Sequence, residues 1–131
     1  MNVLKGSVVL ATALSLLAVP ALASNKYDSF AGQAMAASIA HEKCSSVTRI
    51  GGDNSQQFVF QAAEIAKQQN GLRVQKVRRI LFYNQRAWLV EQARLTLDAR
   101  DVDLSDTSGL CAFARRVAGK EDTVGRFLRR N

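Results

Sequence analysis

The sequence has few of the residues that most often carry catalysis or metal binding. Its 131 residues include one histidine, His41, and two cysteines. A zinc site needs three or four Cys, His or carboxylate ligands close together, and no segment supplies such a cluster. No Cys-x-x-Cys motif occurs, and no glycine-rich loop continues into Lys-Ser or Lys-Thr as a phosphate-binding loop does. We therefore assign no catalytic residue, and we expect no metal and no cofactor.

Two local patterns resemble functional sites, a cysteine–histidine pair and a calcium-binding loop. Ordinary helix and turn structure explains both more simply. His41 lies three residues before Cys44, but this spacing also arises in an ordinary helix, and a disulfide would consume the thiol. The acidic stretch 101–106 opens like a calcium loop, yet Asp106 and Ala112 stand where that loop needs glycine and glutamate. A polar connection with Ser105 or Asp106 as a helix N-cap accounts for it. A hydrolase whose acids meet only in the fold remains an alternative.

The chain has no apolar run of the roughly 20 residues that a membrane-spanning helix needs. Its longest run, 8–19, follows Lys5 and precedes Pro20 and Ala21-Leu22-Ala23. This order of charge, apolar core and A-x-A site predicts a signal peptide over residues 1–23, cut after Ala23. We expect one exported domain, residues 24–131, in the periplasm or secreted, and no transmembrane segment after processing. A retained N-terminal anchor is the alternative.

Both cysteines, Cys44 and Cys111, lie in the predicted exported part, 67 positions apart. Exported chains meet an oxidising compartment, where two cysteines permit one intramolecular pairing. We predict a structural disulfide between them. Free thiols, or a disulfide to a partner chain, are the competing possibilities.

Strand patterns are weak throughout, whereas helical spacing of apolar residues recurs. Gly51-Gly52-Asp53-Asn54 breaks the chain, with Asp53 or Ser55 available as the next N-cap, and Asn70-Gly71 resembles a helix C-cap. The predicted fold is all-α, a small bundle of four to five helices stapled by one disulfide. The expected helices cover about 29–47, 55–69, 73–100 and a segment ending near 118. A short final helix that contains Val124, Phe127 and Leu128 is expected after them.

The segment 73–100 is apolar on more than one side, which predicts a helix that packs against several neighbours at the centre of the domain. Tyr83-Asn84 could divide it, with Asn84 capping a second piece, and the pattern leaves both possibilities open. Helical spacing also predicts the core, which comprises Phe58, Ile65, Val77, Leu81, Trp88, Leu95 and Leu110.

Arginine supplies twelve of the eighteen basic residues of this chain, whose formal charge is +7. Arginine makes planar, bidentate contacts with carboxylates and phosphates. The C-terminal arginines are therefore candidates for binding an acidic protein or an anionic envelope component, and export argues against nucleic acid. A solvated basic face that keeps the domain soluble is the alternative. The candidate residues are Arg115, Arg116, Arg126, Arg129 and Arg130.

Three short motifs near the C-terminus carry a resemblance to a known family. They are Leu110-Cys111-Ala112-Phe113, Ala118-Gly119-Lys120 and Gly125-Arg126-Phe127-Leu128. The chain resembles small exported helical proteins of alphaproteobacteria that share a domain of unknown function. The resemblance implies a helical fold with two matching cysteines, and it implies no activity.

These observations favour a non-enzymatic exported protein, an envelope accessory or protein-binding module whose partner and oligomeric state stay open. The plan of a small helical domain with one disulfide is also similar to that of immunity proteins that block cell-wall hydrolases, and to that of acid-stress chaperones. These are the alternative functions.

Overall fold

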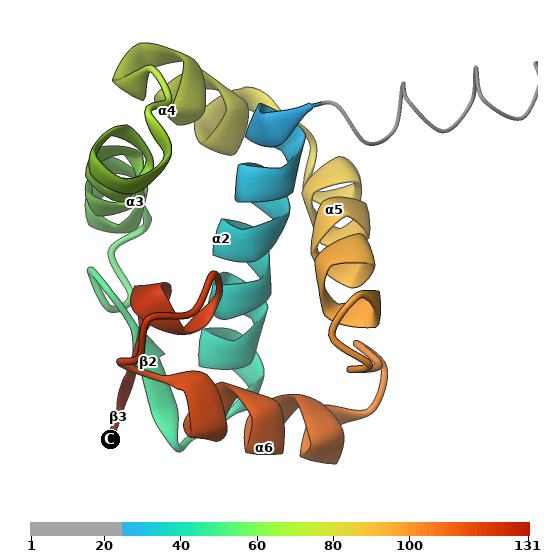
Figure 1. The fold of residues 1–131 in the computed structure, drawn as a ribbon. Coiled ribbons are helices and arrows are strands. Elements are labelled where there is room, and N and C mark those ends of the chain that lie inside the picture. Colours follow the sequence, from blue (N-terminus) through green and yellow to red (C-terminus); the bar gives the residue numbers. More distant parts are fainter. Residues whose placement is uncertain (1–24) are drawn as a thin grey trace, which may run out of the picture.

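A computed structural model describes residues 25–131, which fold into five α-helices and a two-stranded sheet (Figure 1). The predicted helical bundle with one disulfide is confirmed, whereas the predicted signal peptide lies outside the described residues. None of the described helices is both long and apolar enough to cross a bilayer. The elements are α2 (Lys26–Lys43), β2 (Val47–Arg49), α3 (Ser55–Asn70), α4 (Val74–Tyr83), α5 (Arg86–Asp98), α6 (Thr107–Val117), the 3-10 helix η1 (Gly125–Phe127) and β3 (Leu128–Arg130).

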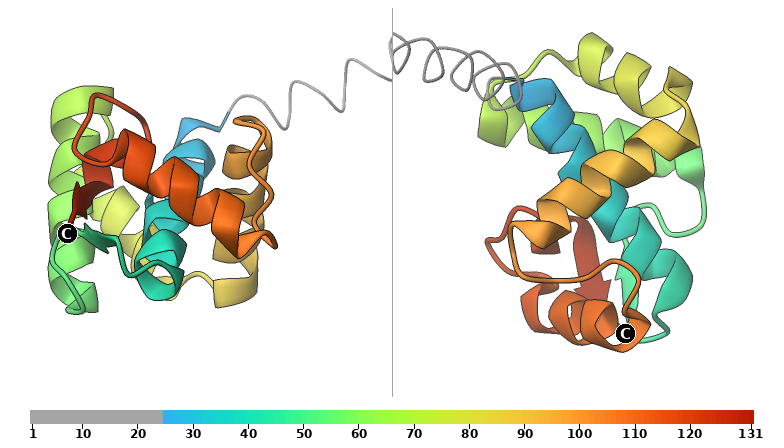
Figure 2. Two further views of the ribbon diagram at one scale, coloured as in Figure 1. Left: turned by 90° about the horizontal axis from the view of Figure 1, so that it is seen from below. Right: turned by 90° about the vertical axis from the view of Figure 1, so that its right-hand side faces the viewer.

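Helix α2 occupies the centre of the domain. It runs between α3 and α5, with α4 at one end and α6 at the other (Figures 1 and 2). Ten consecutive or near-consecutive residues from Phe30 to Ala40 are buried, on every side of the helix. The prediction that segment 73–100 is central was wrong. Alanine gives a weak hydrophobic pattern, but small side chains let several helices approach one axis, so the alanine-rich helix takes that place.

Helices α2 and α5 approach each other closely, and Gly32 makes this approach possible. A Cβ at position 32 would overlap the backbone carbonyl of Gln92 and the hydroxyl of Thr96. Ala93 faces the same interface and is fully buried. Small residues therefore set the distance between these two helices.

The segment 73–100 is two helices, divided at Asn84 and Gln85. Asn84 does not cap the second piece. It ends α4, where its side-chain amide donates to the carbonyl of Ile80, while Gln85 precedes α5 without a side-chain cap bond. The break resets the helical phase, so α5 buries Leu89, Ala93 and Leu97.

Because of this phase change, the observed core differs from the predicted one. Phe58, Val77 and Leu110 are buried as predicted. Ile65, Leu81 and Trp88 are partly buried at the edge of the core. Leu95 was predicted wrongly, because it is 47 % exposed on the outer face of α5.

Three helix starts follow the expected capping chemistry. Asn25 accepts from the backbone N–H groups of Tyr27 and Asp28, so α2 begins before the predicted Ser29, and it ends at Lys43 rather than Val47. Asn54, not Asp53 or Ser55, caps α3, and Asp106 caps α6 as one of the two predicted candidates. Gly71 ends α3 with a φ of 65°, a left-handed conformation that favours glycine.

The C-terminal segment ends in a strand, which the sequence did not predict. Only η1 of the predicted short helix forms, and β3 then pairs antiparallel with β2, with Thr48 opposite Arg129. Three-residue strands are too short to show an alternating pattern. The pairing places the C-terminal strand beside β2, the strand that follows α2.

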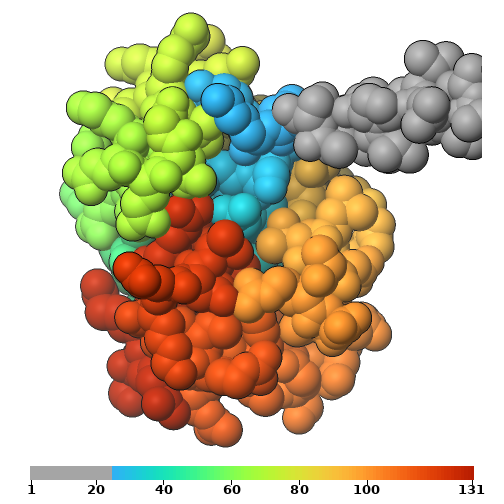
Figure 3. Space-filling model, viewed as in Figure 1, coloured from blue at the N-terminus to red at the C-terminus, as the bar shows by residue number. Residues whose placement is uncertain are grey.

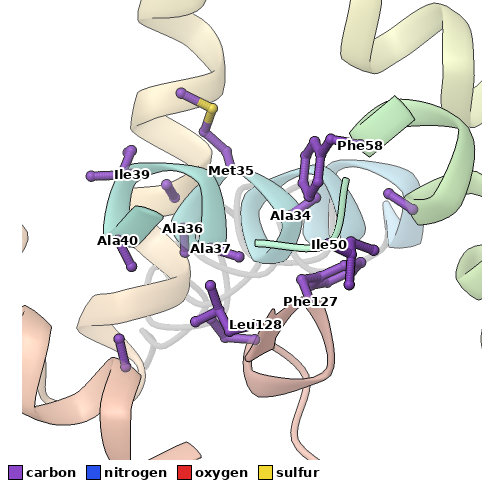
Figure 4. Close-up of a cluster of buried hydrophobic side chains, with 14 of the residues drawn as sticks. Ala34, Met35, Ala36, Ala37, Ile39, Ala40, Ile50, Phe58, Phe127 and Leu128 are labelled. Atoms are coloured by element: carbon purple, nitrogen blue, oxygen red, sulfur yellow. The ribbon is translucent and has the colours of Figure 1, made fainter. Parts of the chain in front are cut away.

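The core joins α2 to Phe58 of α3 and to the C-terminal residues Phe127 and Leu128 (Figure 4). The ring of Phe127 meets Phe30 and Phe58 edge to face, at centroid distances of 5.5 and 6.3 Å. The predicted disulfide is present, with Cys44 and Cys111 bonded at an S–S distance of 2.06 Å. It ties the end of α2 to the first turns of α6.

Candidate functional site

The predicted C-terminal arginines do not form one continuous surface. Arg115 and Arg116 are exposed in the last turn of α6, and the Arg116 guanidinium lies 5.5 Å from the Phe113 ring centroid. Arg129 and Arg130 are exposed on β3, where consecutive side chains point to opposite faces of the ribbon. None of these four has a carboxylate partner among residues 25–131.

Arg126, the fifth predicted residue, is bonded within the domain. Its guanidinium donates to the side-chain oxygens of Gln33, Gln69 and Asn70, at 2.7 to 2.9 Å. Burial lowers the pKa of Arg126, and the charge of Asp122 opposes this effect. Arg126 therefore joins the C-terminal segment to α2 and α3.

Asp122 fixes the loop between α6 and η1. It accepts two bonds from the guanidinium of Arg100 and two from the backbone N–H groups of Val124 and Gly125. Burial raises the pKa of this carboxyl, but the bonds from Arg100, Gly125 and Val124 together lower it below its ordinary value. These contacts give Asp122 a structural role.

His41 connects α2 to the segment that joins β2 to α3. Its Nδ1 accepts from the backbone N–H of Arg49 at 3.3 Å, so in the neutral ring Nε2 carries the proton and donates to Asp53 at 2.6 Å. The acidic stretch 101–106 is likewise used locally, since Asp103 bonds Ser105 and Asp106 bonds the N–H of Gly109.

A cleft with a volume of about 230 Å³ lies where α2, β2, α3 and the junction of α4 with α5 meet. Its polar wall includes Ser38, Glu42, Arg49 and Arg86, and its apolar wall includes Phe58 and Leu89. Arg86 pairs with Glu42 at 2.9 Å, and both side chains are largely exposed. Sequence reasoning missed this cleft, because its residues come from five separate elements.

Arg49 is the notable group in this cleft, because it is only 8 % exposed. Its Nε donates to the carbonyl of Gly52, and its terminal nitrogens donate to the hydroxyls of Ser38 and Ser55. The guanidinium also lies 4.6 Å from the centroid of the Phe58 ring. Burial lowers the pKa of Arg49, while the charges of Glu42 and Asp53 oppose that shift.

An exposed aromatic and basic surface lies beside the cleft, at the α4 end of the domain. Phe60, Phe82 and Tyr83 form a chain of neighbouring rings with centroids 6.2 and 6.4 Å apart, and Arg78 stacks on Phe60 at 4.4 Å. Phe82 is 41 % exposed and Tyr83 81 % exposed. We call these residues, together with Lys76 and Arg79, the α4 surface.

The charge around the α4 surface has one sign. Residues 65–90 contain six basic residues and no acidic residue. Within the described chain only Arg86 of these six pairs with a carboxylate. A scan of local charge along the sequence could have found this stretch. The crowding of arginines at the C-terminus drew the prediction there instead.

Comparison with known proteins adds no further identification, since no family model, no curated protein and no solved structure matches this chain.

Proposed function

We propose that this chain is a non-enzymatic exported protein that binds the anionic lipid surface of the cell envelope through the α4 surface. The observation that carries the proposal is that one short helix combines exposed aromatic rings with cations that pair with no carboxylate among residues 25–131. Lys76, Arg79 and Tyr83 recur at i, i+3 and i+7, so one face of α4 presents both chemistries.

Lipid is favoured over an acidic protein because of how these residues are arranged. A helix that lies at a membrane interface has basic residues on its polar face and aromatic residues at the boundary. Aromatic rings such as those of Phe82 and Tyr83 can enter the headgroup region. Each basic residue near an anionic bilayer adds about 1 kcal/mol of attraction.

Export is part of the same proposal. The disulfide between Cys44 and Cys111 is compatible with an oxidising compartment, and the N-terminal sequence has the features of a signal peptide. In that compartment the accessible anionic surfaces are those of the envelope.

Vesicle binding tests the proposal. The mature chain, residues 24–131, is sedimented with phosphatidylglycerol vesicles and, separately, with phosphatidylcholine vesicles. We expect binding to the anionic vesicles that weakens as salt is raised, because exposed charges are screened. A Phe82→Ser/Tyr83→Ser variant should bind more weakly at the same salt and melt within a few degrees of the wild type.

Two results would refute lipid binding. One is equal sedimentation with both vesicle types, and the other is an unchanged affinity of the aromatic variant. Binding to an acidic protein with no binding to either vesicle would point to the alternative partner class.

A further inference from the structure

We propose that the cleft around Arg49 binds a small organic monoanion, a carboxylate with a compact apolar body. This site is separate from the α4 surface and does not depend on lipid binding. The carboxylate would bind the guanidinium of Arg49, and the apolar body would lie against Phe58 and Leu89. Both walls line the same cleft.

The first argument is the charge of Arg49. The residue is more than nine-tenths buried, yet its hydrogen-bond partners are one carbonyl and two hydroxyls, all neutral. Buried charges in proteins are normally paired with an opposite charge. A guanidinium has five N–H donors, and these three bonds leave one N–H on each terminal nitrogen. Those two donors match the two oxygens of a carboxylate.

The second argument is the charge balance of the cleft. Glu42 is the carboxylate in the lining, and it is bonded to Arg86 at 2.9 Å rather than to Arg49. Asp53 is bonded to His41 at 2.6 Å. Ser55 begins α3, so the positive end of that helix adds to the same preference. Glu42 and Asp53 therefore act on Arg49 only through space, and a ligand carboxylate would supply the direct ion pair that Arg49 lacks among the described residues.

The third argument concerns size and shape. The volume of about 230 Å³ is below the roughly 300–1,000 Å³ of pockets for drug-sized ligands. Phe58, Val59 and Leu89 are buried core residues that form the apolar wall. A small aromatic or short aliphatic acid meets both requirements, whereas inorganic anions lack the apolar part.

Benzoate is a suitable probe, with the neutral benzamide as its matched control. Amide chemical shifts of the ¹⁵N-labelled mature chain are followed during titration with each compound. We expect saturable benzoate shifts that cluster at residues 35–59 and 81–89, and much smaller shifts with benzamide. No saturable shift with benzoate, or equal affinity for both compounds, would overturn the proposal.

Variants assign the binding to the arginine. Arg49→Lys keeps the charge but loses the paired donors, so benzoate affinity should fall about tenfold or more. Arg94→Lys, which changes an arginine of α5 outside the cleft lining, should bind like the wild type. If Arg49→Lys fails to fold, Arg86→Gln at the exposed rim replaces it, and it should also weaken benzoate binding because it exposes the charge of Glu42. Unchanged affinity in the folded cleft variant would refute the assignment.

Discussion

At the scale of single residues, the charged side chains of this domain divide into those that hold the fold and those that face solvent. Arg126 and Asp122 belong to the first group, because each bonds several segments of the chain. Arg79 and Arg115 belong to the second, with no side-chain bond within the described chain. Counting arginines in the sequence cannot separate these groups. The distinction depends on which polar groups the fold brings within reach.

The Arg100–Asp122 pair leads to a prediction about pH. The folded pKa of Asp122 is lowered, so its ionised form is more stable in the folded state than in the unfolded chain. This contribution is complete above the ordinary aspartate pKa of about 3.9, and it is lost as pH falls through the lower folded value. Asp122→Asn should therefore cost about 1 to 3 kcal/mol of unfolding free energy at neutral pH, with the deficit shrinking below about pH 4.

Denaturant unfolding of both proteins from pH 7 to pH 2 measures this difference. Asp98→Asn is the matched control, because Asp98 pairs with Arg94 at the surface and exposed pairs contribute about 0 to 1 kcal/mol. A deficit for Asp122→Asn that stays constant down to pH 2 would show that the ionised carboxylate is not its source.

At the scale of elements, the fold depends on how closely α5 can approach α2. Exchanging glycine for alanine inside a helix ordinarily stabilises it by about 0.5–1 kcal/mol. At Gly32 we expect the opposite sign, because the added methyl would overlap the backbone carbonyl of Gln92. Overpacking of this kind typically costs about 1–3 kcal/mol.

Thermal melts of Gly32→Ala and Ser29→Ala test this expectation on one helix. Ser29 is exposed on α2, so its replacement should leave the melting temperature nearly unchanged or slightly raised. A Gly32→Ala protein that melts above the wild type would contradict this expectation, because it would show that the interface between α2 and α5 accommodates the added methyl group.

The elements also show which parts of the fold the sequence could predict. Helices with strong local signals were found nearly to the residue, as with α3, where Asn70-Gly71 ends the helix. The junction of α4 with α5 was identified as a possible break, but its effect on helical phase was not. The predicted core therefore included the exposed Leu95 and omitted the buried Leu97. The pairing of β2 with β3 depends on residues about 80 positions apart, and no local pattern records such a contact.

At the scale of the whole molecule, the two groups of exposed cations lie at opposite ends of α2. The space-filling view places the yellow-green α4 segment at one end and the red and orange C-terminal segments at the other (Figure 3). Much of α2 is covered between them. The disulfide fixes α6 against the end of α2, and in the chain-entropy model so long a loop adds about 4 kcal/mol of stability. Because the two groups of cations lie far apart, substitutions can remove charge from one end of the molecule without changing the other end.

The candidate sites were only partly accessible to sequence reasoning. The disulfide followed from cysteine number and the expected compartment, because two cysteines have one intramolecular pairing. The Arg49 cleft could not be predicted, since the burial of Arg49 depends on the turn at Gly51 and Gly52 and on Phe58 beyond it. The α4 surface was visible as charge but not as exposure, because only packing shows that Tyr83 lies outside.

The most direct test of the account compares two variants that lose the same charge from opposite ends. Lys76→Gln/Arg79→Gln removes two cations from the α4 surface, and Arg115→Gln/Arg130→Gln removes two exposed cations from α6 and β3. Affinity for phosphatidylglycerol vesicles is measured for both at one salt concentration. At about 1 kcal/mol for each basic residue near the membrane, the α4 variant should bind roughly 30-fold more weakly than the wild type, and the C-terminal variant should bind nearly as well. Equal losses, or a larger loss in the C-terminal variant, would contradict the assignment of membrane binding to α4.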